Sequence, residues 1–347
     1  MSSSTTKIGD NQITTINADF ICDKYALDNE NISQEITDIL IDCLFNPLIE
    51  NNGFANEEFK LRKQELLDSI DNQINEKRVY AFLRANQTIY KGERCAIPSY
   101  GTKTGAEALT AQNSYEAYKK LLKTACIEIT LAGGQNLDNV KNKLVNAFSK
   151  IDREPENFEY KSYSPLKTNI AECSDELDVN QCKMVMAFKT DYKNYFANKL
   201  MQTMFGGTAF SKLFMNVREK YSLCYYCAAN YVESKGTLLV DSGVETENVS
   251  KAREEILNQL NALSTGDFTD DEIKNAVLSI AGDFKSNYDS IKDIGSWYFV
   301  QKLRKSNMTP EDAIKELNSV TREQIIKAAK SFKLDTVYVM RKKEGKQ

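Results

Sequence analysis

Apolar residues recur along this chain at two spacings, which alternate from one segment to the next. Alternation of apolar and polar residues predicts strands over residues 12–21, 126–131, 169–173, 179–188, 237–244 and 336–341. Spacings of three and four predict helices over residues 33–46, 56–78, 79–90, 114–122, 137–148, 249–263, 291–303, 314–317 and 323–331, with another starting at Thr269. In the strand over residues 179–188, one face carries the expected core residues Cys182, Met184, Met186 and Phe188. This mixture predicts an α+β fold.

The two parts of the chain repeat each other. Residues 53–60 (G-F-A-N-E-E-F-K) match residues 267–274 (D-F-T-D-D-E-I-K), which lie 214 positions later. Thr110, with the helix and strand that follow it, matches Thr321 at an offset of 211. Chance similarity between amphipathic helices is the alternative, but two matches in the same order favour a duplicated α+β unit.

A change of composition separates the two repeats. Residues 151–168 contain Pro155 and Pro165, two of the five prolines, among charged residues and tyrosines without helical spacing. Such a segment is typical of a linker between domains. We therefore expect domains over residues 1–150 and 169–347.

Composition excludes several classes of protein. The net charge is −4 and no basic run occurs, which argues against nucleic-acid binding. No stretch approaches the roughly 20 apolar residues that cross a bilayer, so no membrane association is expected. The N-terminal residues M-S-S-S-T-T-K-I lack an apolar signal core, so we expect a cytoplasmic location.

The count of zinc ligands is the most informative part of the composition. There is no histidine, which excludes a Ser-His or Cys-His nucleophilic site and any histidine-built zinc site. The eight cysteines lie mostly in apolar runs and are interpreted as reduced core residues. Cys224 and Cys227 form a C-x-x-C, but a spacing of three in a strand directs them to opposite faces, so no redox or metal pair is expected there.

The segment from residue 202 to residue 227 carries the clearest motif. An apolar helix ends at Gly206-Gly207, where two residues without Cβ permit a sharp turn and a close backbone approach. A second helix follows, and then a β-prone run. Arg218 lies at the end of that helix and Tyr225 on the strand. A charged planar fork beside a phenol suits the binding of a peptide carbonyl or an oxyanion.

This segment, with its R-E-K-x-x-L-x-Y sequence after a Gly-Gly turn, resembles the second half of the insulinase (pitrilysin) family of zinc peptidases. The resemblance implies two tandem homologous half-domains, each a mostly antiparallel sheet packed with helices. It also implies that Arg218 and Tyr225 contact substrate, on a turn shaped by Gly206 and Gly207. The alternative is an arginine that caps its own helix and a tyrosine packed in the sheet.

The other half of the family's active site is missing. The family's H-x-x-E-H helix cannot occur without histidine, and the position that resembles the distal zinc glutamate is Arg62. An arginine cannot bind a cation. Glu58 and Glu65 are interpreted as a solvated helix face. The resemblance also places a strand pair and the H-x-x-E-H helix before residues 12–21, so we expect a short first domain with an uncovered sheet edge and apolar surface, which favours a partner.

The resemblance implies a non-catalytic subunit of an insulinase-like peptidase. Such a chain binds no metal itself and positions a peptide for a zinc-bearing homologous partner, as a heterodimer; a homodimer is the other assembly considered. The alternative function is a peptide-binding or scaffold protein with no role in hydrolysis. An enzyme that uses acids and phenols such as Asp191, Tyr192, Asp241 and Asp283 is a third possibility, but no spacing singles out a pair among them.

Overall fold

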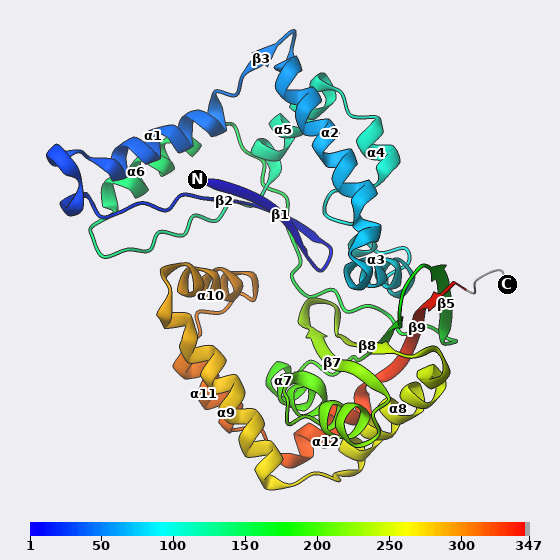
Figure 1. The fold of residues 1–347 in the computed structure, drawn as a ribbon. Helices are drawn as coiled ribbons and strands as arrows, with labels where there is room; N and C mark the ends of the chain where they lie inside the picture. The colour runs from blue at the N-terminus through cyan, green and yellow to red at the C-terminus, as the bar shows by residue number, and fades with distance from the viewer. Residues whose placement is uncertain (344–347) are drawn as a thin grey trace.

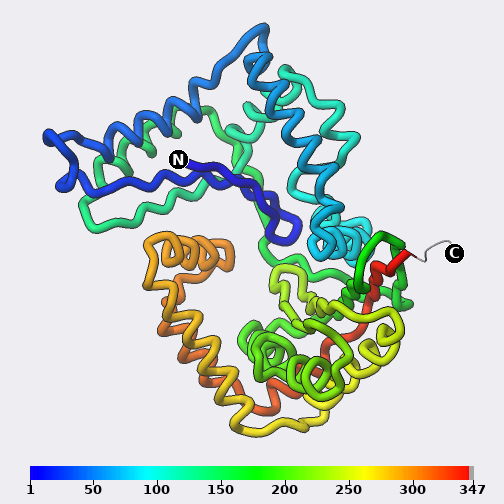
Figure 2. The backbone as a smooth tube through the Cα atoms, viewed as in Figure 1, coloured from blue at the N-terminus to red at the C-terminus, as the bar shows by residue number. Residues whose placement is uncertain are grey.

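The structure is a computed structural model that describes residues 1–343. The N-terminal half contains β1 (Ser2–Ile8), β2 (Asn11–Asn17), η1 (Asp23–Tyr25), η2 (Leu27–Asn29), α1 (Ile32–Phe45), β3 (Ile49–Glu50), β4 (Gly53–Phe54), α2 (Asn56–Asn72), η3 (Gln73–Asn75), α3 (Lys77–Ile89), η4 (Arg94–Ala96), α4 (Lys103–Glu107), α5 (Ala111–Thr124) and α6 (Asp138–Phe148). Residues 151–168 form no helix or strand and lead from this half into the next (Figure 2).

The C-terminal half contains β5 (Ala171–Leu177), β6 (Cys182–Lys189), α7 (Tyr195–Gln202), η5 (Thr203–Gly207), η6 (Leu213–Lys220), β7 (Cys224–Val232), η7 (Glu233–Lys235), β8 (Thr237–Val244), η8 (Thr246–Asn248), α8 (Val249–Thr265), α9 (Asp270–Ser286), η9 (Asn287–Asp289), α10 (Ile291–Leu303), α11 (Pro310–Asn318), α12 (Arg322–Ser331) and β9 (Lys333–Lys342). Its sheet has the strand order β5-β9-β6-β8-β7, in which only β5 and β9 pair in parallel. This architecture confirms the predicted α+β fold.

The sheet of the C-terminal half is covered on both faces. One face packs on a large core with α7, α8, α9, α11 and α12, and the predicted core residues Cys182, Met184, Met186 and Phe188 are all fully buried there. The opposite face carries Val185 and Ala187, and α3 covers it (Figure 1). A helix from the first part of the chain therefore completes the packing of the second.

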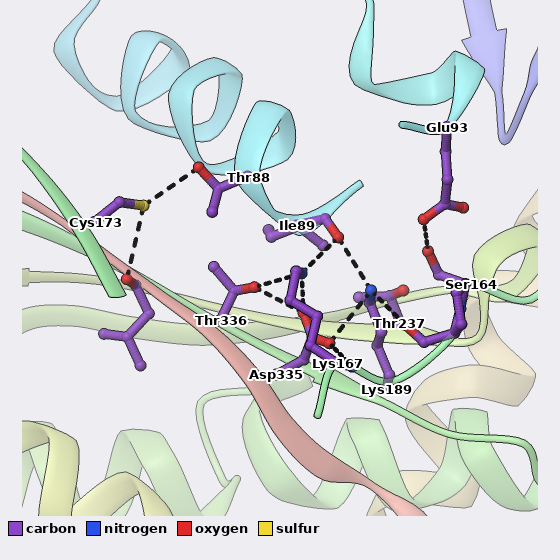
Figure 3. Close-up of polar contacts among 12 residues, drawn as sticks. Thr88, Ile89, Glu93, Ser164, Lys167, Cys173, Lys189, Thr237, Asp335 and Thr336 are labelled. Carbon is purple, nitrogen blue, oxygen red and sulfur yellow. Dashed lines mark hydrogen bonds and ion pairs between the residues drawn. The ribbon is translucent and has the colours of Figure 1, made fainter. Parts of the chain in front are cut away.

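Buried polar contacts hold α3 on this sheet. The last carbonyl of α3, at Ile89, accepts hydrogen bonds from the ammonium groups of Lys167 and Lys189 at 2.9 and 3.0 Å (Figure 3). Both lysines also pair with the buried carboxylate of Asp335, at 2.6 and 3.3 Å. Nearer the middle of α3, Arg84 binds Asp175 through two hydrogen bonds. The two lysines donate charged hydrogen bonds to both the helix carbonyl and the buried carboxylate. These contacts hold α3 on the sheet in one defined position.

The internal repeat is visible in the element bounds. The series α2, η3 and α3 recurs as α9, η9 and α10, and every bound of the second series lies 214 residues after its counterpart. The helices α5 and α12 begin at positions 211 apart, each after a capping box formed by Thr110 or Thr321. The helix predicted to start at Thr269 is α9, which begins with a capping box formed by Thr269 and Glu272. The helices of the predicted α+β duplication therefore recur at the predicted offsets, while the expected domain boundaries at residues 150 and 169 stay a prediction.

The N-terminal half differs from expectation in its strands. It has two two-stranded hairpins, β1–β2 and β3–β4, in place of a larger sheet. The strand predicted over residues 12–21 ends at Asn17, and residues 126–131 form no strand, because neither segment has further strands beside it to pair with. The long helix predicted from Asn56 is interrupted at η3. In α1, the buried positions are Ser33 and Thr37, while the apolar Ile39 is half exposed.

Candidate functional site

The predicted Gly-Gly turn packs directly against the sheet. It forms a π-helical turn, η5, and a Cβ placed on Gly206 would lie 2.7 Å from the backbone nitrogen of Ala229 and 2.8 Å from a methyl carbon of Leu213. A Cβ on Gly207 would meet the amide nitrogen of Gln202 at 2.8 Å, and that side chain donates to the Ala229 carbonyl. Gly206 therefore permits the close backbone approach expected from the sequence.

The second helix of the motif, η6, is also π-helical and carries Arg218 in its last turn. The side chains of Leu213 and Val217 are fully buried on its inner face. The Arg218 guanidinium lies over the Phe214 ring at 4.6 Å from its centre and 3.6 Å from the Glu219 carboxylate. Among the described residues the side chain of Arg218 donates no hydrogen bond, so its N–H groups are available to a ligand. The alternative of an arginine capping its own helix carbonyls does not describe this geometry.

A β-bulge at the start of β7 determines where Tyr225 lies. Cys224 pairs with Val244 and Tyr226 pairs with the next residue of β8, Gly243, so Tyr225 is the extra residue of the bulge. Its side chain is 68% exposed. Bulges next to functional sites commonly redirect a side chain in this way. Tyr225 therefore points out of the sheet, and the alternative of a tyrosine packed in the sheet is not what the structure contains.

Arg218 and Tyr225 line one surface pocket with a volume of about 320 Å³. Its other lining residues are Glu219, Ser222, Leu223, Cys224, Glu245 and Asn248. Ser222, with a φ of 50°, turns the chain from η6 into β7. The pocket thus combines a cationic fork, a phenol and two carboxylates. The sequence motif contained Arg218 and Tyr225, but it gave no signal for Glu245, which directly follows β8, or for Asn248, the last residue of η8.

The thiol of Cys224, which lines the pocket, has a pKa below its ordinary value. A hydrogen bond with the Cys227 thiol lowers the pKa of Cys224; burial opposes this effect, and the positive charge of Arg218 adds to it. The same hydrogen bond, together with burial, raises the pKa of Cys227 well above its ordinary value. The prediction that these two cysteines face opposite sides of the strand is wrong, because the bulge adds one residue between them.

The described residues do not fit a catalytic zinc ion. Arg62, at the position resembling the distal zinc ligand, is exposed and pairs with Glu65 at 2.8 Å. Within residues 1–343, one cluster of possible ligands exists, formed by Asp10, Glu93 and Cys95. The buried ammonium of Lys235 occupies it, at 2.7 Å from Asp10 and 2.6 Å from Glu93. A lysine therefore supplies the positive charge there.

Comparison with known proteins shows which protein family this chain resembles in sequence and structure. The family described as "Peptidase M16 inactive domain" matches residues 108–285. The "Probable inactive metalloprotease YmfF" of Bacillus subtilis is 28% identical over 349 residues, covering 99% of this chain and 82% of that protein. A crystal structure of a conserved protein from Enterococcus faecalis V583 superposes with a TM-score of 0.87 at 25% identity, over 99% of this chain and 82% of that one.

A peptidase M16 inactive domain from Pseudomonas fluorescens shares the fold, with a TM-score of 0.73 at 17% identity over 90% of this chain and 76% of its own. Within residues 1–343, none of the helices has the length and apolar content needed to span a membrane.

Proposed function

Because this chain belongs to the peptidase M16 inactive-domain family, we propose that it is a non-catalytic subunit that positions a peptide substrate for a zinc-bearing homologous partner. The observation that carries the proposal is the β-bulge that turns Tyr225 out of the sheet into the pocket lined by Arg218. The contacts of Arg218 with Phe214 and Glu219 lie within its own helix, and the Tyr225 side chain is 68% exposed, so both polar groups face solvent at the pocket.

The chemistry of the pocket suits an extended peptide. The Arg218 guanidinium and the Tyr225 hydroxyl are hydrogen-bond donors that can bind a peptide carbonyl and stabilise negative charge on its oxygen. The carboxylates of Glu219 and Glu245 can accept hydrogen bonds from peptide N–H groups. Hydrolysis itself requires an activated water, which the partner's zinc ion would supply.

The proposal assigns zinc binding to the partner chain and substrate positioning to this one. In this proposal the other chain provides the zinc ligands, because this sequence contains no histidine and Arg62 pairs with Glu65. A homodimer lacks this contribution, so the proposed active assembly is a heterodimer. A cytoplasmic location belongs to the same proposal, and cell fractionation checks it.

A scaffold or peptide-binding protein with no role in hydrolysis is the second candidate. Exposed apolar side chains on the N-terminal half favour it, since Leu48, Ile49 and Ile39 offer surface for a partner whether or not that partner is a peptidase. This candidate predicts partner binding without any effect of the pocket on turnover.

The discriminating experiment combines capture and kinetics. The tagged chain is used to capture partners from its native cell extract, and a captured homologue carrying H-x-x-E-H is then assayed with a peptide library, with and without this chain. For Arg218→Ala we expect kcat/KM to fall about tenfold to a hundredfold, because a hydrogen bond to a charged group contributes about 1.5–3 kcal/mol.

The matched control is Lys220→Ala, which removes a positive charge from the same helix at a position that does not line the pocket. This control should keep full turnover, and both variants should bind the partner as the unmodified chain does. Equal turnover for Arg218→Ala and Lys220→Ala would reject the positioning role and leave the scaffold function. Failure to capture any H-x-x-E-H protein would also favour the scaffold.

A further inference from the structure

Cys224 and Cys227 lie on the same face of β7, although three residues separate them in the sequence. Their partners on β8 are Val244 and Ser242, which are two residues apart and therefore point to one side of the sheet. Cys227 belongs to the large core on that side, and Cys224 packs against the same core. Between them, Tyr226 faces the opposite side, where its hydroxyl donates to Asp241 at 3.3 Å.

The two thiols differ in access. Cys227 is buried, whereas Cys224 is partly exposed and lines the pocket beside Arg218. A thiolate close to a guanidinium and to a neighbouring S–H donor is the arrangement found at reactive cysteines, and a second thiol behind it can resolve a mixed disulfide. The remaining cysteines include Cys43 and Cys126, which are exposed, and Cys95, where burial raises the pKa to about 12.

We propose that Cys224 and Cys227 form a redox-active dithiol that small-molecule disulfides oxidise. The Cys224 thiolate attacks one sulfur of the reagent disulfide, forming a mixed disulfide and releasing one reagent thiolate. The Cys227 thiol then gives up its proton, and its sulfur attacks Cys224. The second reagent thiolate leaves, so two protein thiols become one disulfide while the reagent disulfide becomes two thiols.

Oxidation changes the pocket at its edge. The disulfide would close a short loop around the bulge that presents Tyr225 and would replace a thiol next to Arg218 with a neutral, fixed sulfur. The dithiol itself does not depend on a peptide substrate or on a partner chain, so it can be tested on this chain alone.

The test uses the full chain, folded and reduced, with oxidised glutathione as the probe. After incubation, free thiols are alkylated and tryptic peptides are identified by mass. Cleavage after Lys220 and Lys235 gives the peptide 221–235, which contains Cys224 and Cys227 and no other cysteine. We expect peptide 221–235 to carry no alkyl group and to be two hydrogen atoms lighter than its reduced, unalkylated form. The peptides containing Cys43 and Cys126 should be alkylated, because their thiols stay free.

Two variants separate attack from resolution. Cys227→Ser should accumulate glutathione on Cys224, because the resolving thiol is gone, whereas Cys224→Ser should leave Cys227 reduced. Cys43→Ser is the control and should oxidise at 221–235 as the unmodified chain does. Retention of both thiols in peptide 221–235 under conditions that modify Cys43 or Cys126 would overturn the proposal. Glutathione that persists on Cys224 in the unmodified chain would overturn the pairing with Cys227.

Discussion

The turn that shapes the candidate site leaves no space for a side-chain carbon at Gly206. A Cβ there would lie 2.7 Å from the Ala229 nitrogen and 2.8 Å from both the Ala229 Cβ and the Leu213 Cδ1. The two Ala229 atoms are fixed by the backbone of β7, and the Leu213 side chain is fully buried. None of the three atoms can therefore move aside easily. The substitution Gly206→Ala must therefore displace η5 from the sheet.

We expect Gly206→Ala to lower the free energy of unfolding by about 1–3 kcal/mol, the usual range for adding volume to a well-packed core. For a domain of about 150–250 residues, each 1 kcal/mol shifts the midpoint of thermal unfolding by about 2–4 °C. Denaturant unfolding followed by circular dichroism, with calorimetry as a check on two-state behaviour, measures the change.

Gly282→Ala is a matched control with the opposite expected sign. Gly282 lies inside α9, and a Cβ at this position would have no neighbour within 4 Å. Replacing a glycine by alanine in a helix should stabilise the chain by about 0.5–1 kcal/mol. If Gly206→Ala were as stable as Gly282→Ala, the close approach of η5 to β7 would not exist and the placement of the pocket would be wrong.

Two further predictions concern buried charges. Burial alone would raise the pKa of Asp335, but hydrogen bonds, above all from Lys167, hold it below the ordinary value. Its stabilising effect is therefore complete above the unfolded pKa of about 3.9 and is lost as the pH falls through the lower folded value. Asp335→Asn should be less stable at pH 7 and lose less stability than the unmodified chain on acidification below pH 4, as measured by denaturant unfolding; equal acid sensitivity would contradict this. Lys235→Met should lower stability by about 3–5 kcal/mol, because Asp10 and Glu93 lose their buried partner. Added zinc should raise the thermal midpoint of this variant and not that of the unmodified chain, and an equal response of the two would refute the role assigned to the lysine.

Patterns within single elements predicted the helices and one face of the central sheet. The alternation at Cys182, Met184, Met186 and Phe188 was sufficient because each of these side chains enters one core. The repeat was visible because helix caps and apolar spacing are local signals. The bulge at Tyr225 and the π-helical form of η6 were not predictable, since they arise from how β7 and the helix fit the same core.

Strand formation in the N-terminal half shows the limit of local patterns. Residues 126–131 alternate as a strand should, yet a strand requires hydrogen-bonding partners that lie elsewhere in the chain. The pattern predicts which residues favour extended backbone, and pairing decides whether a strand forms. The same reasoning explains why the helices of the repeat agree so closely while its sheets do not.

The repeat also explains why α3 and α10 have different surroundings. Both occupy the same position in their series, and α3 covers one face of the five-stranded sheet with Ala81, Ala85 and Ile89. By the same relation α10 should cover a sheet of the N-terminal half, and a Cβ at Gly295 of α10 would indeed lie 3.5 Å from the Thr130 methyl carbon. Because residues 126–131 are not paired into a sheet, α10 has less to cover. The α10 residues that match Ala81, Ala85 and Ile89 are Gly295, Phe299 and Leu303. They are only partly buried, whereas the three α3 residues are at most 1% exposed.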